Sequence, residues 1–399
     1  MIPRYRAEFT GVTESPLVQV ATEAERTPGA IKLCYGESDL PTPAFIVRAA
    51  HEAALAGHTQ YTHTAGAPEL RAAIAAKVHE LQQVEVRATE VMATVGGTMG
   101  IYLAIRACVG AGENAVIIAP AYAIYANGVV MAGGEARQVP LASTALGFTL
   151  DIDRVTAAID SRTRMIVVNS PSNPTGWMIT EAEQRALLEL AARHDLVILS
   201  DEVYERLTFD TPIAPSLARL TDSQTRDRLI VINSFSKTYN MTGWRLGWAQ
   251  ASERTVRLMH SAAEFITSNP TAMVQQAGIV ALRDGEDSVR EMRAHLTVRR
   301  AQVQAALVGI AGVTIAEPAG AFYVFARIAE LTDSAALASR LVREAGVALA
   351  PGSAFGPGGE GHLRLCFAAS EATLAEALSR LRRQLGEAHT VSRRADFAL

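Results

Sequence analysis

The sequence is poor in cysteine, in aromatic residues and in long apolar runs. Only three of its 399 residues are cysteine, at Cys34, Cys108 and Cys366. Their odd number and wide spacing exclude a disulfide framework and a CxxC metal or redox motif, and are typical of a reducing cytosol. The apolar runs fall far short of the roughly 20 residues that span a membrane. We therefore expect a cytoplasmic protein with no membrane segment and no metal site.

The chain also lacks an excess of either charge. Its formal net charge is −4, with 20% charged and 49% hydrophobic residues. This balance argues against nucleic acid or an acidic membrane as a partner. The N-terminus lacks the apolar core of a signal peptide. A chain of this length and apolar content can bury the cores of two or three domains.

From residue 91 onward, apolar β-branched segments alternate with helical patterns. We expect strands at 91–95, 115–118, 165–168, 196–199, 229–232 and 246–251, with helices such as 99–109 and 182–194 between them. Apolar strands that alternate with helices predict an α/β fold whose mainly parallel sheet is covered on both faces.

After about residue 285 the pattern changes to α+β, with helices expected at 290–307, 334–346 and 371–385. This change indicates a second, smaller domain. We expect residues 1–45 to form an N-terminal arm and part of the small domain, 46–284 the large domain, 285–386 the C-terminal small domain and 387–399 a polar tail.

The segment from Ser234 to Gly247 directly follows an expected buried strand, where open α/β sheets place their chemistry. A lysine in a protein-lined pocket can lose its proton and attack a carbonyl, and Lys237 lies among small hydroxyl residues. Ser234, Ser236 and Arg245 could hold a phosphate. The combination suggests pyridoxal phosphate (PLP) on Lys237, and the alternative is a solvated lysine at an ordinary strand-to-loop junction.

Other strand ends carry residues that fit the same ligand. Gly97 and Thr98, in a Gly-Gly-Thr turn, could offer backbone N–H groups and a hydroxyl to a phosphate. Two prolines and a glycine around Asn173 predict an irregular backbone that leaves its amide free to donate. An aromatic ring at Tyr122 could stack on a flat heterocycle.

Two charged residues stand in apolar strands. A carboxylate at Asp201 needs a cationic or donor partner, and a protonated pyridine nitrogen is one. Tyr204, three residues later, could reach the ring hydroxyl. Arg364 could hold a substrate carboxylate with its two-pronged guanidinium, or it could face water from an edge strand.

Four motifs occur together, in the order Asn173-Pro174-Thr175-Gly176, Ser200-Asp201-Glu202-x-Tyr204, Ser234-x-Ser236-Lys237 and Thr242-Gly243-Trp244-Arg245-x-Gly247. With their spacing, they resemble the class I/II, aspartate aminotransferase-like PLP enzymes from about Gly36 to Arg364. The resemblance implies the PLP-transferase fold of type I and PLP-dependent aminotransferase activity.

The resemblance also implies roles. Lys237 would form the Schiff base with PLP and act as acid and base in the proton shift. Asp201 would pair with the pyridine nitrogen, while Asn173 and Tyr204 would bond the ring hydroxyl. Tyr122 would stack on the ring.

The phosphate would be held by Gly97, Thr98, Ser234, Ser236 and Arg245. Arg364 would grip the α-carboxylate of the substrate, aided by Asn173 and the backbone near Gly36. Tyr61 matches a tyrosine that reaches the phosphate of the neighbouring subunit, so the resemblance implies a homodimer with shared sites.

Two positions that bear on the substrate side chain depart from the bacterial aspartate aminotransferases. Those enzymes carry a lysine for the distal carboxylate where this chain has Thr98. The N-terminal segment used for the same carboxylate contains Glu14, which would repel a second carboxylate or attract a basic side chain. Tyr35, His58 and His63 could shape the side-chain pocket or be ordinary loop residues.

The favoured function is therefore an aminotransferase that moves the amino group of an L-amino acid to a 2-oxo acid by a ping-pong route. A PLP-dependent lyase, oxidase or cyclising synthase on the same fold is the alternative. A PLP-fold regulator or binding protein is a third class, against which the intact Lys237, Asp201 and Arg364 argue.

Overall fold

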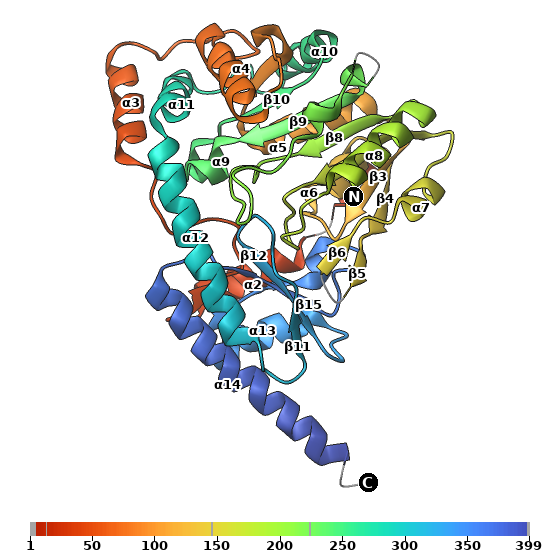
Figure 1. Ribbon diagram of the computed structural model, residues 1–399, viewed down its shortest axis with the longest axis vertical. Helices are drawn as coiled ribbons and strands as arrows, with labels where there is room; N and C mark the ends of the chain where they lie inside the picture. Colours follow the sequence, from red (N-terminus) through yellow and green to blue (C-terminus); the bar gives the residue numbers. More distant parts are fainter. Residues whose placement is uncertain (1–4, 13, 145–146, 223–224, 397–399) are drawn as a thin grey trace.

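The computed structural model describes residues 5–12, 14–144, 147–222 and 225–396. A seven-stranded sheet and a four-stranded sheet each form the centre of a packed core. The long helix α12 (Glu286–Leu307) runs alongside both (Figure 1). In the described residues, no helix combines the length and apolar character that a membrane span requires.

The larger sheet has seven strands. Their order is β2 (Val91–Thr94), β10 (Gly247–Gln250), β9 (Leu229–Ser234), β8 (Val197–Asp201), β7 (Thr163–Asn169), β3 (Asn114–Ala119) and β4 (Glu135–Pro140). Neighbours run parallel except at β10, which is antiparallel to both β2 and β9. The prediction of an α/β fold with a mainly parallel sheet is confirmed. The edge strand β4 escaped prediction because its sequence, Glu-Ala-Arg-Gln-Val-Pro, is largely polar and contains a single buried residue.

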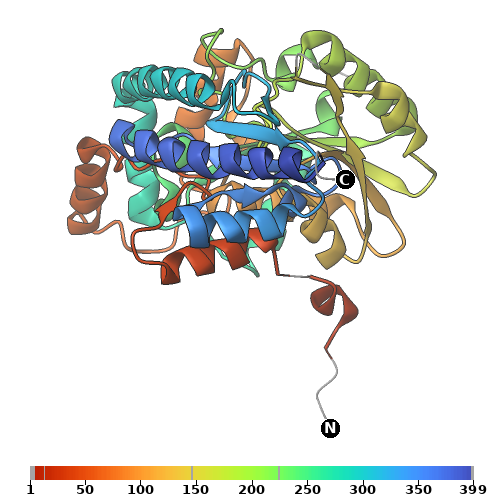
Figure 2. The same ribbon diagram turned by 90° about the horizontal axis from the view of Figure 1, so that it is seen from below.

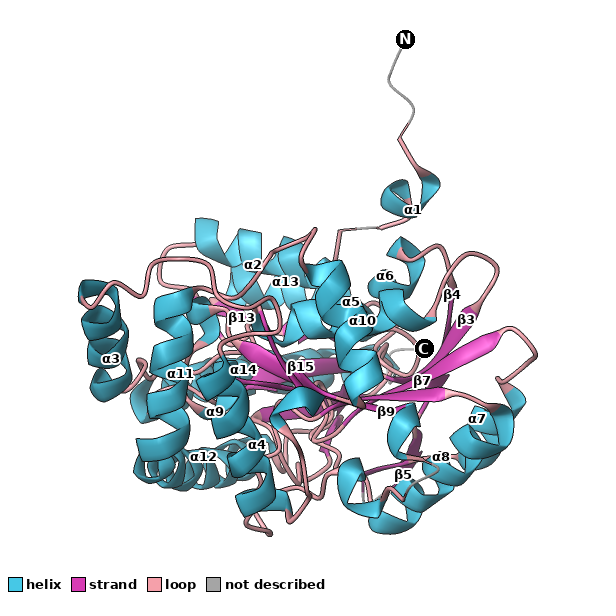
Figure 3. Ribbon diagram, turned by 90° about the horizontal axis from the view of Figure 1, so that it is seen from above, coloured by secondary structure: helices cyan, strands magenta, loops and turns pink. Residues whose placement is uncertain are grey.

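Alternate residues of each central strand enter different cores. In β7, Met165 and Val167 pack with α5 (Gly96–Cys108), α6 (Ile124–Met131) and α10 (Glu253–Ala263). Ile166 and Val168 pack on the opposite face with α7 (Ile152–Ala157) and α8 (Glu181–His194). Figure 3 shows helices on both faces of the strands. Burial on both faces explains why the strands read as continuous apolar runs.

A third group of helices covers the β2 end of the sheet. It comprises α3 (Ala44–Leu55), α4 (Pro68–Gln82) and α11 (Ala272–Asp284), and α11 packs against both of the others. Helix α11 ends one residue before Gly285, and α12 begins one residue after it.

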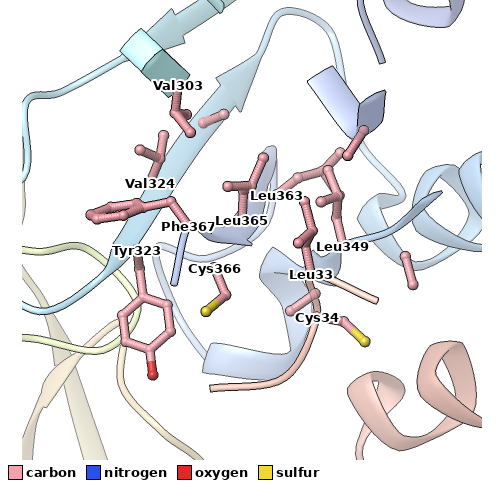
Figure 4. Packing of buried hydrophobic residues seen from close by; sticks show 14 of the residues in the cluster. Leu33, Cys34, Val303, Tyr323, Val324, Leu349, Leu363, Leu365, Cys366 and Phe367 are labelled. Carbon is pink, nitrogen blue, oxygen red and sulfur yellow. The ribbon is translucent and has the colours of Figure 1, made fainter. Parts of the chain in front are cut away.

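The smaller sheet is antiparallel, in the order β11 (Val313–Ile315), β12 (Tyr323–Ile328), β15 (His362–Cys366) and β14 (Ala350–Pro351). It packs with α2 (Pro16–Arg26), α13 (Ser334–Ala345) and α14 (Glu371–Asp396). Figure 4 shows Leu33 beside Leu349 and Leu363 in this core. Strand β1 (Ile31–Lys32) pairs in parallel with β13 (Val347–Ala348), so the N-terminal segment and the C-terminal part share one core.

Shorter elements complete the chain. They are α1 (Ala7–Thr10), the hairpin of β5 (Ala142–Thr144) and β6 (Gly147–Thr149), α9 (Phe235–Thr238) and the 3-10 turns Ala88–Glu90, Leu217–Leu220, Arg226–Arg228, Thr242–Trp244 and Gly352–Phe355. Helix α1 projects away from the body of the molecule (Figures 2 and 3).

One boundary differs from expectation. The last helix was expected to end at residue 385, but α14 continues to Asp396, so most of the expected polar tail is helical. The turn to polar residues does not by itself end a helix; no proline follows Leu385, and the helix continues through Gly386. Residues 397–399 lie outside the described part. The division into the three domains and the tail stays a prediction.

Candidate active site

The ends of three parallel strands meet at one edge of the larger sheet. Asn169, Asp201 and Ser234 are the last residues of β7, β8 and β9. A cavity of about 270 Å³ opens beside them, the position where open α/β sheets bind ligands. Every predicted site residue except Tyr61 lines it: Gly36, Gly97, Thr98, Tyr122, Asn173, Asp201, Tyr204, Ser234, Ser236, Lys237, Arg245 and Arg364.

Tyr61 lies elsewhere. It belongs to the loop between α3 and α4, and its side chain is 89% exposed. His63 of the same loop has its ring 5.6 Å from that of His260. Neither Tyr61 nor His58 or His63 is among the described residues that line the cavity, whereas Tyr35 is.

Lys237 lies on the short helix α9, in the connection that folds β9 back onto antiparallel β10. Phe235, two residues earlier, anchors this helix by packing edge-on against Trp248 with 5.2 Å between the ring centroids. The Lys237 ammonium donates to the carbonyl of Gly36. Desolvation by burial lowers the pKa of Lys237 to about 8. A neutral amine, the nucleophilic form, is therefore accessible near neutral pH.

Asp201 is a buried carboxylate whose hydrogen bonds in the described structure come from neutral donors. Tyr125 donates to its Oδ2 at 2.7 Å, and the backbone N–H of Val203 donates to its Oδ1 at 3.2 Å. Burial raises the pKa of Asp201 to about 6, while these hydrogen bonds act in the opposite direction. A buried carboxylate held by neutral donors is suited to a cationic ligand atom such as a protonated ring nitrogen.

A set of anion-binding groups lies across the cavity. Gly96 has a φ of +72°, and a Cβ built there would lie 2.2 Å from Nη2 of Arg245. Only glycine lets the guanidinium approach the first turn of α5 so closely. On the neighbouring strand end, the Ser234 hydroxyl accepts from the Ser236 N–H at 3.1 Å and lies 2.9 Å from its Oγ. Helix N–H groups, hydroxyls and a guanidinium together suit a phosphate.

Arg364 forms the wall contributed by the smaller sheet. It is 2% exposed and is flanked by the rings of Tyr323 and Phe355, at 4.6 and 5.0 Å from its Cζ. Nη1 donates to Oδ1 of Asn173 at 2.8 Å, and Nη2 donates to the carbonyl of Cys34. Its Nε is buried without a hydrogen-bond partner in the described structure. A buried cation held only by neutral acceptors is suited to an incoming carboxylate.

Tyr125, Asn169 and Tyr323 are among the lining residues that had no predicted role. Tyr125 contacts Asp201, as described above. The Asn169 side chain accepts from the Asn173 N–H at 2.8 Å and donates to the Asp201 carbonyl at 2.9 Å. The hydroxyl of Tyr323 on β12 lies 2.7 Å from that of Tyr204, which lies in the turn after β8. Tyr125 follows Tyr122 by three residues, one helical turn, and this spacing was a usable signal.

Residues 28–381 match the family Aminotransferase class I and II. The chain belongs to this family. The match covers nearly the whole aminotransferase, and members of the family depend on PLP. The lysine, the buried carboxylate and the phosphate-binding groups of the cavity fit that cofactor.

Named relatives agree with this assignment. The aminotransferase is 34% identical to aspartate aminotransferase of Bacillus subtilis, across 94% of this chain and 97% of the relative. It is 35% identical to aromatic-amino-acid aminotransferase 2 of Thermococcus litoralis, across 94% and 97%. Its fold matches N-succinyldiaminopimelate aminotransferase from Mycobacterium tuberculosis with a TM-score of 0.90 at 32% identity, across 95% and 99%. The predictions of the family, the type I fold, the cofactor and the aminotransferase activity are confirmed.

Proposed function

We propose that this aminotransferase binds an L-amino acid and a 2-oxo acid in turn, with the α-carboxylate of each on Arg364. The proposal rests on one observation: Arg364 is buried, at 2% exposed, and its guanidinium donates only to neutral acceptors. Its forked donors match a carboxylate, the group that both substrates share. Arg364 and Lys237 line the same cavity, so a substrate whose carboxylate is held by Arg364 presents its Cα to Lys237.

We assign Lys237 the covalent attachment of the cofactor and the transfer of the proton at the substrate Cα. When bound, PLP supplies an aldehyde for the amino group and a ring that withdraws electrons from Cα. Asp201 holds the proton on the ring nitrogen, because a buried carboxylate stabilises a cationic partner. Burial lowers the pKa of Lys237 to about 8, which matches a group that both accepts and donates a proton near neutral pH.

The remaining predicted residues take binding roles in this proposal. Tyr122 stacks on the cofactor ring, and Asn173 and Tyr204 bond its hydroxyl. The phosphate lies among Gly97, Thr98, Ser234, Ser236 and Arg245. The exposed Tyr61 reaches the phosphate of a second subunit, so the working form is a homodimer, which we expect to act in the cytoplasm.

The test begins with the colour of the purified protein. We expect a visible absorption band from the lysine-bound cofactor, and its loss in Lys237→Ala. Single amino acids are then added without a 2-oxo acid. An aminotransferase should release one equivalent of oxo acid per site and stop until an acceptor is added. Continuous release of ammonia would instead indicate a lyase or an oxidase. Absence of the band in the wild-type protein would contradict the whole proposal.

A further inference from the structure

A second cavity, of about 590 Å³, adjoins the catalytic one. We propose that it receives the substrate side chain, and that the aminotransferase therefore acts on amino acids with a bulky apolar or aromatic side chain. This proposal rests on the proposed function, because it takes the α-carboxylate to be held by Arg364.

The two cavities adjoin and share part of their lining. Leu17, Thr98, Tyr122 and Ile124 line both of them. Phe355 connects them to the carboxylate-binding end, since its ring lies 5.0 Å from Cζ of Arg364 and the same residue lines the second cavity. The apolar lining of the second cavity thus begins beside the place that we propose for a substrate held at Arg364.

The N-terminal helix supplies part of this lining. Ser15 caps α2, and its hydroxyl accepts from the N–H of Leu17 at 3.3 Å. Helix α2 packs on α13 and on the strands β13 and β14, which fixes its position against the smaller sheet. Leu17 and Val18 consequently face the cavities from a packed element rather than from a free arm.

The second cavity carries no formal charge among its described lining residues; its polar members are hydroxyl and amide side chains. The catalytic cavity has three cations, and the proposed function already assigns each one: Arg364 to the α-carboxylate, and Lys237 and Arg245 to the cofactor. Within the described lining, a distal carboxylate would find no further cation.

An apolar side chain gains from this surface, whereas a carboxylate loses water without a compensating charge. Thr98 occupies the boundary between the two cavities as a neutral residue. Glu14 precedes Ser15 of the lining, so the nearest charge along the chain is negative. Acidic amino acids are therefore disfavoured at the point where apolar ones are accepted.

The test uses the holoenzyme and single amino acids, with the loss of the visible band as the readout of one half-reaction. We expect the second-order rate for phenylalanine and leucine to exceed that for aspartate and glutamate by on the order of 100-fold. If the acidic amino acids react faster, the substrate proposal is wrong and the aminotransferase assignment stands. If no amino acid removes the band, the proposed function itself fails.

A variant locates the side chain in the second cavity. Val18→Trp should fill the space and lower the ratio of the phenylalanine rate to the alanine rate about tenfold. Val47→Trp is the matched control, because Val18 and Val47 are 47% and 46% exposed on helices and only Val18 lines the cavity. We expect Val47→Trp to keep the wild-type ratio.

The oligomeric state tests the alternative that a second copy of this chain fills the cavity. The mass of each variant is measured by size-exclusion chromatography with light scattering. If Val18→Trp changes the mass and leaves the ratio intact, the cavity belongs to an interface between copies and the proposal is overturned. An unchanged ratio at unchanged mass overturns it as well.

Discussion

The hydroxyl of Tyr125 donates a hydrogen bond of 2.7 Å to Oδ2 of Asp201. Both residues are buried, one on α6 and the other at the end of β8. Burial, together with the carboxylate, raises the pKa of Tyr125, so the phenol stays neutral and can only donate to the carboxylate. The contact therefore favours the ionised form of Asp201 and fixes which way its oxygens point.

Removing this donor should make Asp201 easier to protonate. Burial raises the pKa of Asp201 to about 6, and the hydrogen bond from Tyr125 acts against this rise. Tyr125→Phe should raise the pKa further, so PLP binding is lost at a higher pH as the solution is acidified. We expect the midpoint of this loss to rise by about one pH unit, measured by equilibrium dialysis of PLP. Tyr239→Phe, which changes another buried tyrosine, is the control; equal midpoints in wild type and Tyr125→Phe would contradict the role.

The attachment of PLP should depend on the pH through Lys237. Desolvation lowers the pKa of this ammonium to about 8, and only the neutral amine attacks an aldehyde. The rate at which the protein without cofactor captures PLP should therefore rise with pH and level off above about 8. Stopped-flow absorbance measures it, with Lys32→Ala as an exposed-lysine control. A rate that still climbs at pH 10 would show an ordinary lysine.

A change of shape without a change of charge tests Arg364. Arg364→Lys keeps the cation but removes the forked donors, so kcat/KM should fall by about 10- to 100-fold. Arg300→Lys is a matched control, because Arg300 also stacks on an aromatic ring, with 4.3 Å between its Cζ and the centroid of Phe209, outside the cavity. Equal kinetics in the two variants would remove Arg364 from substrate binding.

Gly96 should matter because of its neighbour. Gly96 and Gly112 have φ values of +72° and +81°, so alanine costs about 1 kcal/mol of backbone strain at each. At Gly96 the added Cβ also meets Arg245, whereas no atom lies within 4 Å of it at Gly112. We expect Gly96→Ala to raise the Kd of PLP at least about tenfold and Gly112→Ala to leave it unchanged. Similar affinities in both variants would separate Arg245 from the cofactor phosphate.

An ion pair of α12 should stabilise the fold at neutral pH. Both Nη groups of Arg206 donate to Glu286, at 3.1 and 2.7 Å, and these hydrogen bonds lower the pKa of Glu286 to about 2. The stabilisation is complete above the ordinary value of 4.5 and is lost as the pH falls towards 2.

Glu286→Gln should therefore lower the Tm at pH 7, by the equivalent of about 1 kcal/mol because the carboxylate is partly exposed, and the deficit should shrink with acid. Thermal unfolding followed by circular dichroism measures the difference. Glu181→Gln, at an exposed pair with Arg185, is the control. A deficit that does not change with pH would contradict the electrostatic cause.

Local patterns in the sequence were sufficient for the parts of the site that strands carry. Apolar runs buried on both faces of the sheet, each followed by polar residues, identified the strand ends at Asp201 and Ser234. Parallel strands bring their carboxyl ends to one edge, so residues far apart in the chain had to meet there. The order of the motifs then indicated the family, and with it the fold and the cofactor.

Only the tertiary structure decided which partners these residues have. Gly247 pairs with Ser234 because β10 runs back along β9, which holds Lys237 at the tip of the connection. Tyr125 and Asp201 are 76 positions apart, and Leu17 reaches the cavity through the packing of α2. Such contacts depend on how helices dock on sheets, which is set by the combined packing of many side chains. A sequence pattern records which face of an element is buried, and the packed fold decides what that face meets.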